Sequence, residues 1–147
     1  MSKHDGADLI LKLYELRREE TMRKARDWYF RDFNPQSMAE FTEAMMGEHS
    51  GHLRMVVSYW DMAAALVDGG SISLELFANS NAEHIGVFAK VELLLGDIRR
   101  SFGPRFAVNL EKLIDAIPEG RQQVAAFRER MQGIREQLAG RQRATAG

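Results

Sequence analysis

The fold is decided by residues 50–68, which read SGHLRMVVSYWDMAAALVD. Read as a helix, this segment carries two apolar stripes: Leu53, Val56, Val57, Trp60, Ala64 and Val67 on one, and Met55, Tyr59, Met62 and Leu66 on the other. A helix that is apolar around most of its circumference belongs in a protein interior. We therefore predict a central helix over residues 50–68, ended by the left-handed turn that Gly69-Gly70 permits.

Prolines and capping sequences divide the rest of the chain. Proline occurs only at positions 35, 104 and 118, each where a helix could begin. Two segments, 37–40 and 80–83, have the Ser-x-x-Glu pattern of a capping box. We predict further helices over residues 8–33, 37–46, 80–102, 103–117 and 118–140, with a small turn or helix at 74–78.

The predicted fold class is all-α: a single-domain bundle of five to seven helices with an apolar central helix. The domain spans residues 1–140, and residues 141–147 form a disordered C-terminal tail. The last two helices are expected to form a hairpin packed on the bundle. The final helix repeats apolar residues at 3-4-3-4 spacing, which makes a narrow seam of two heptads: Val124, Phe127, Met131, Ile134 and Leu138.

Composition excludes several classes of function. The chain of 147 residues has no cysteine, which excludes disulfides, thiolate metal sites and a thiol nucleophile, and fits a reducing compartment. The longest apolar stretch, residues 55–67, is too short to cross a bilayer, and the first residues lack the pattern of a secretory signal. We expect a bacterial cytoplasmic protein with no membrane contact.

Charge is unevenly distributed. The net charge of −1 gives no general attraction to nucleic acid, so we expect no nucleic-acid partner. Residues 34–97 hold nine acids and two bases, a net charge of −7, whereas residues 98–147 hold ten bases and five acids, a net charge of +5. The favoured interpretation is that the basic C-terminal helices lie against the acidic middle. The alternative is a basic face offered to a partner.

One polar cluster has the residue types of a metal site: Glu48, His49 and His52, with Glu83 and His84 at the start of a later helix. The paired Glu-x-x-His signature of di-iron bundles is absent, so we favour histidines that line a junction between helices. We predict that His49 or His52 lies within about 8 Å of Glu83 or His84, in a hydrogen-bonded cluster that pins two helices. A metal or ligand site there is the alternative.

No catalytic residue can be assigned. A histidine could serve as general base, but no Arg or Lys lies four to six residues before His49, His52 or His84, as small helical nucleases would place it. A nucleophile elbow and a phosphate-binding glycine motif are also absent. The adjacent Tyr59 and Trp60 are interpreted as packing residues rather than a ligand pocket. No cofactor is expected.

The chain carries five short motifs: Tyr14-Glu15-Leu16-Arg17-Arg18-Glu19, Asn34-Pro35-Gln36-Ser37, Gly47-Glu48-His49-Ser50, Ser58-Tyr59-Trp60-Asp61-Met62-Ala63-Ala64 and Glu83-His84. In these it resembles a bacterial family of small uncharacterised helical proteins, over most of residues 9–130. It is similar, more remotely, to a broader domain of unknown function that includes phage abortive-infection proteins. The resemblance implies an all-helical, cytoplasmic, bacterial protein and transfers no catalytic residues.

Two functions follow as hypotheses. The first is a non-enzymatic helical interaction or regulatory module, which forms a homodimer or binds another protein through its first helix or its C-terminal hairpin. The charged faces of those helices, which no core would cover, favour it. The second is a small metal- or ligand-binding bundle, with or without enzymatic activity, centred on Glu48, His49, His52, Glu83 and His84.

Overall fold

The computed structural model describes residues 3–146, and every regular element in that range is helical. The all-α prediction is confirmed, although the helices outnumber the five to seven predicted because two predicted helices are each divided. No helix in the described range is both long and apolar enough to cross a membrane. The elements are α1 (Lys3–Arg17), α2 (Glu20–Arg31), α3 (Met38–Met46), α4 (Ser50–Asp68), α5 (Leu74–Ser80), α6 (Glu83–Ala89), the 3₁₀ turn η1 (Glu92–Leu94), α7 (Leu95–Phe102), α8 (Val108–Ala116) and α9 (Gly120–Ala146).

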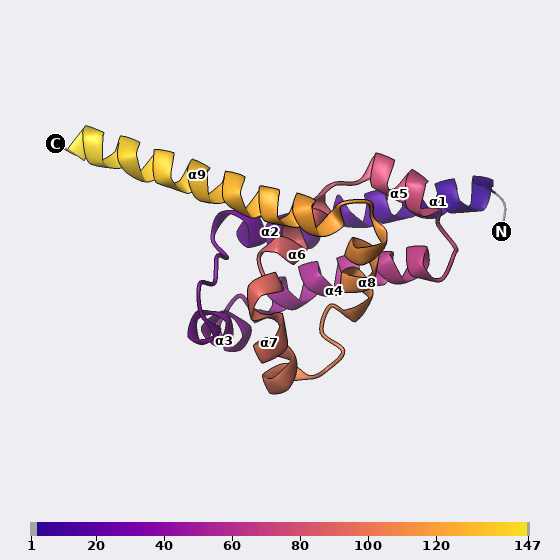
Figure 1. The fold of residues 1–147 in the computed structure, drawn as a ribbon, viewed down its shortest axis with the longest axis horizontal. Coiled ribbons are helices and arrows are strands. Elements are labelled where there is room, and N and C mark those ends of the chain that lie inside the picture. Colours follow the sequence, from indigo (N-terminus) through magenta and orange to yellow (C-terminus); the bar gives the residue numbers. More distant parts are fainter. Residues whose placement is uncertain (1–2, 147) are drawn as a thin grey trace.

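Helix α4 has the predicted bounds and the predicted central position (Figure 1). It packs against α2, α3, α5, α6 and α8, and its side chains at Leu53, Val56 and Trp60 are almost completely buried. It ends at the predicted glycine pair, where Gly70 has a φ of 86° and the Ser71 N–H bonds back to the Leu66 carbonyl. The periodic apolar pattern of one segment thus identified the core of the bundle.

The prediction of one continuous helix over residues 8–33 is wrong, because the helix breaks between Arg17 and Glu20 into α1 and α2. Glu19 leaves the helical conformation, with φ −59° and ψ 143°, and its carboxylate accepts the Met22 N–H at 3.1 Å. Backbone hydrogen bonds from Thr21, which has the largest effect, and from Met22 lower the pKa of Glu19. A glutamate within a charged run therefore acts as the N-cap of α2.

The helix predicted over residues 80–102 is also divided. Ser80 is the last residue of α5, its hydroxyl bonds to the Leu76 carbonyl, and Ala82 precedes α6 without a side-chain cap. The second predicted capping box is therefore wrong. Helix α6 ends at Ala89, and the chain passes through η1 before α7 begins. The first predicted box is confirmed at Ser37, which accepts the Glu40 N–H at 3.2 Å.

The last two helices pack on different partners: α8 lies mainly against α4, and α9 mainly against α6. The predicted hairpin is therefore splayed, and a close turn at Gly120 joins its arms. A Cβ at Gly120 would lie 2.0 Å from the Ile114 carbonyl oxygen, so only glycine fits. Helix α9 then extends past the body of the fold to Ala146, through residues 141–146 of the predicted disordered tail (Figure 1). Those six residues are exposed, and residue 147 lies outside the described range.

Candidate functional site

Two of the candidate histidines lie against Trp28. At the start of α4, His49 stacks on the Trp28 ring at 5.3 Å between centroids, and His52 lies 6.1 Å from it. The two imidazoles are 5.7 Å apart, and the buried Nδ1 of His52 has no hydrogen-bond partner among the described residues. Glu48 is exposed beside them. This group is an aromatic stack that joins α2 to α4.

Glu83 belongs to a second group, further along α4. Its carboxylate pairs with the Arg26 guanidinium through contacts of 2.8–3.0 Å, and its Oε2 also accepts the Trp60 indole N–H at 2.8 Å. Arg26 donates in addition to the Arg17 carbonyl at 3.1 Å. Both ends of this partly buried ion pair are therefore held, and it ties α2, α4 and α6 together.

His84 is buried beside that ion pair. Only 2% of its surface is exposed, and its ring lies 5.0 Å from Phe77 and 5.9 Å from Trp60. Within residues 3–146 its Nδ1 has no hydrogen-bond partner, and burial lowers its pKa from 6.5 to about 4. The imidazole is therefore neutral at pH 7 and contributes mainly through packing.

The prediction that His49 or His52 forms a hydrogen-bonded cluster with Glu83 or His84 is wrong. In residues 3–146, no ring contact, hydrogen bond or ion pair joins the two groups; Glu83 binds Arg26 and Trp60 instead. Within the same range, no three His, Asp or Glu side chains are arranged to hold a metal ion. The five candidate residues thus divide between two aromatic junctions.

Sequence reasoning missed two polar contacts that hold this centre. The Tyr59 hydroxyl donates to the Leu13 carbonyl at 2.5 Å and accepts from Arg17 at 3.1 Å, which fixes α1 on α4. Asp61 accepts the Leu110 backbone N–H at 2.9 Å and so supplies the side-chain cap that α8 lacks at Ala107. Asp61 lies in the middle of the narrow polar face of the central helix, and that position was the available signal.

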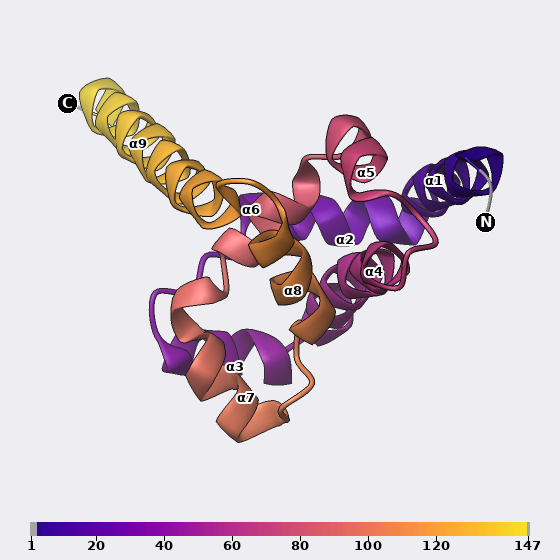
Figure 2. The same cartoon turned by 45° about the vertical axis from the view of Figure 1, so that its right-hand side comes forward.

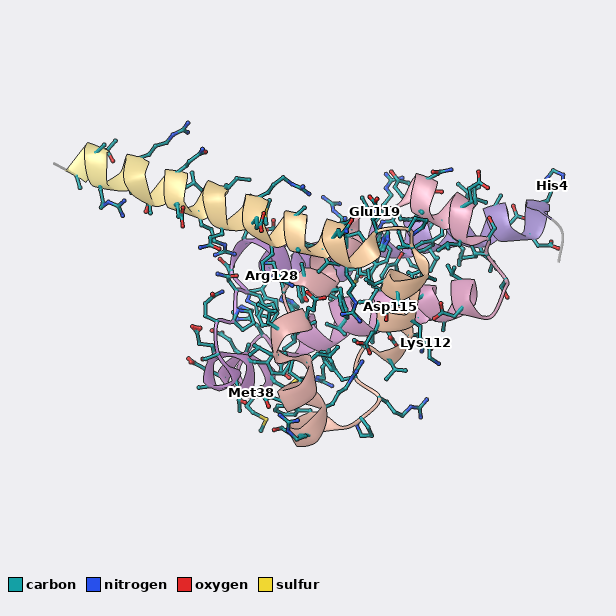
Figure 3. The ribbon with its side chains drawn as sticks, in the orientation of Figure 1. His4, Met38, Lys112, Asp115, Glu119 and Arg128 are labelled. Carbon is teal, nitrogen blue, oxygen red and sulfur yellow. The ribbon has the colours of Figure 1, made fainter. Side chains whose placement is uncertain are left out.

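The basic C-terminal region lies partly against the acidic middle, as the charge distribution favoured. Arg121 and Arg128 both pair with Glu92, and Arg121 also binds Glu111 and Asp115. Arg128 reaches from α9 toward the body of the fold (Figure 3). These pairs fix the first half of α9. Further along the described helix, four arginines have no ion pair: Arg130, Arg135, Arg141 and Arg143.

The apolar seam of α9 continues past the body. Val124 is buried, and Phe127 and Met131 are partly buried against the fold, whereas Ile134 and Leu138 are 47% and 50% exposed. In Figure 1 the C-terminal half of α9 has no helix beside it, and in Figure 3 its side chains extend into open space. We call Met131, Ile134 and Leu138 the α9 stripe.

An acidic hollow lies between the end of α2 and α3. Helix α3 lies on the side of the fold away from the start of α1 (Figure 2). It has a volume of about 440 Å³ and is bordered by four carboxylates. Met46, at the end of α3 near this hollow, is 74% exposed. We call this surface the acidic α3 face; its acids are Asp32, Glu40, Glu43 and Glu48.

A family model described as "Domain of unknown function (DUF4760)" matches residues 4–117. No curated protein and no solved structure matches the chain. The matched segment contains nearly all of α1 and the whole of α2 through α8, so α9 lies beyond it.

Proposed function

The chain belongs to the family that this domain of unknown function defines, and we propose that it acts as a helical interaction module that pairs with a second copy through α9. The proposed role of the protein is non-enzymatic. Its proposed location is the bacterial cytoplasm, which the absence of cysteine supports.

The observation that carries the proposal is the α9 stripe. Helix α9 has 27 residues, a length of about 40 Å at 1.5 Å per residue. An unsupported helix is marginally stable in water, and tertiary packing of an apolar face supplies most helical stability. The fold supplies that packing up to Met131 and stops before Ile134 and Leu138. A partner that covers these two side chains would complete the seam.

Charge favours the acidic α3 face of a second copy as that partner. The stripe is flanked by Arg130 and Arg135, so two α9 helices packed together would bring arginines against arginines. The acidic α3 face offers opposite charge together with the exposed Met46. In Figure 1, α3 and the free half of α9 both lie on the side of the molecule away from the start of α1. An isologous pairing would place each α9 on the α3 of its partner through a twofold axis.

The metal- or ligand-binding bundle centred on the five Glu and His candidates gains no support from this geometry. Those residues are divided between Trp28 and the Arg26–Glu83 pair, each group with partners of its own. Interaction through α9 is therefore the function that we propose.

Light scattering coupled to size exclusion tests it with two matched variants. Leu138→Glu places a charge on the α9 stripe, and Gln137→Glu makes the same charge change one residue away, about 100° around the helix. We expect wild type and Gln137→Glu to have twice the chain mass of 16.7 kDa, and Leu138→Glu to have the single mass. A wild-type monomer, or a Leu138→Glu dimer, would contradict the proposal.

A further inference from the structure

A cavity of about 290 Å³ separates α9 from the segments around Pro35 and Lys90. Three cationic residues line it, Lys90, Arg128 and Arg135, and no carboxylate among residues 3–146 does. Asparagine and glutamine amides add donors at its wall, and its apolar lining includes Leu94, Phe127 and Met131. A concave site of this size with a few convergent polar groups is typical of small-molecule binding sites.

Lys90 is held in place within this cavity. Its ammonium donates to the Phe33 carbonyl at 2.6 Å and lies 3.4 Å from the Phe30 carbonyl. Burial first, and then the charge of Arg135, lower the pKa of Lys90 to about 8, while Asp32 raises it. The carbonyl groups orient the ammonium but bring no formal negative charge to it.

Arg128 and Arg135 differ in their partners. Arg128 is neutralised by Glu92 and also donates to the Ala89 carbonyl at 3.3 Å. Arg135 has no hydrogen bond or ion pair with any described residue, although its charge acts on Lys90. Two residues of like charge thus line one cavity, and none of its described lining residues is an acid. Such an arrangement favours a ligand with about two negative charges.

We propose that this cavity binds a small organic phosphate monoester, with Lys90 and Arg135 holding the phosphate and Phe127, Met131 and Leu94 contacting its apolar part. A phosphate monoester carries close to two negative charges at neutral pH, which matches the two cations. The planar Arg135 guanidinium suits bidentate contact with phosphate oxygens. The apolar lining selects against a bare inorganic ion.

Calorimetric titration with phenyl phosphate, inorganic phosphate and phenol tests the site. We expect phenyl phosphate to bind at least about tenfold more tightly than inorganic phosphate, and phenol to show no binding, because both the charge and the apolar body are needed. Equal affinity for phenyl phosphate and inorganic phosphate, or no binding of phenyl phosphate, would overturn the proposal.

Arg135→Gln and Arg141→Gln form a matched pair, since each removes one unpaired charge from α9 and only Arg135 lines the cavity. We expect Arg135→Gln to weaken phenyl phosphate binding by about tenfold or more, and Arg141→Gln to leave it within about twofold. Equal weakening by both variants would indicate general charge attraction and overturn the site. Leu138→Glu should bind phenyl phosphate as wild type does, because the cavity is complete within one chain. This titration therefore separates phosphate binding from self-pairing.

Discussion

The buried imidazole of His84 makes the stability of the fold depend on pH, and His84→Leu should remove that dependence. In the folded protein the ring packs against both Trp60 and Phe77, its Nδ1 has no hydrogen-bond partner among the described residues, and its pKa is about 4. In the unfolded chain the pKa returns to its ordinary value of 6.5. Between these two values the unfolded chain binds the proton and the folded chain does not. The free energy of unfolding therefore falls as the pH falls through this window.

The size of the effect follows from the two pKa values. Each unit of difference corresponds to about 1.4 kcal/mol, so the full loss below pH 4 is about 3 kcal/mol. Between pH 7 and pH 5 the loss attributable to His84 is about 2 kcal/mol. Leucine fills a similar volume and leaves no buried nitrogen without a partner, so stability at pH 7 should be unchanged or slightly higher.

Urea unfolding followed by circular dichroism, at pH 7 and pH 5, measures this difference. We expect wild type to lose about 2 kcal/mol more than His84→Leu over that interval. His4→Gln, which removes an exposed histidine from α1, should keep the wild-type dependence. If His84→Leu loses as much stability as wild type, the pH dependence does not come from a buried, neutral His84.

Three further substitutions test the contacts that organise the fold, all by urea unfolding at pH 7. Glu83→Gln leaves the Arg26 guanidinium partly buried without its counter-charge, and should cost about 2 kcal/mol, whereas an unchanged midpoint would refute the role of the pair. Asp61→Ala removes the acceptor of the Leu110 N–H and should cost about 1 kcal/mol, as the loss of a helix cap does; no cost would show that α8 needs no such cap. Gly86→Ala would place a Cβ 2.7 Å from the Phe127 ring of α9, and should lower the free energy of unfolding by about 1–3 kcal/mol. An unchanged free energy of unfolding would show that α9 does not pack on α6 at this position.

Periodicity and turn chemistry predicted the centre of the fold well. Residues 50–68 are apolar around most of the helix, and the glycine pair that follows them marks where the helix ends. Both ends of α4 could therefore be predicted correctly. The two broken helices could not be predicted in the same way. Glu19 caps α2 from within a charged run, and this depends on how α1 and α2 pack against α4. Such tertiary contacts override local helical preference.

The sequence predicted how charge is distributed between the regions of the chain, but not which charged residues form ion pairs. The acidic excess in residues 34–97 and the basic excess in residues 98–147 predicted that the C-terminal helices lie against the middle of the chain, and the pairs of Arg121 and Arg128 with Glu92 agree with this. The Arg26–Glu83 pair joins residues 57 positions apart, and nothing local to either residue indicates the other. The α9 stripe was visible as a two-heptad seam, but its exposure beyond Met131 depends on where the body of the fold ends.

The central claim, that α9 docks on the acidic α3 face of a second copy, can be tested by cross-linking, because the chain has no natural cysteine. Leu138→Cys and Met46→Cys proteins are treated with a short bismaleimide, separately and mixed, with a Leu138→Cys and Leu11→Cys mixture as control. Leu11 is exposed on α1, at the other end of the molecule (Figure 1). The account predicts a cross-linked dimer in the Leu138→Cys and Met46→Cys mixture, and little in either protein alone or in the control. Cross-linking of Leu138→Cys alone to the same extent, or none in the mixture, would contradict it.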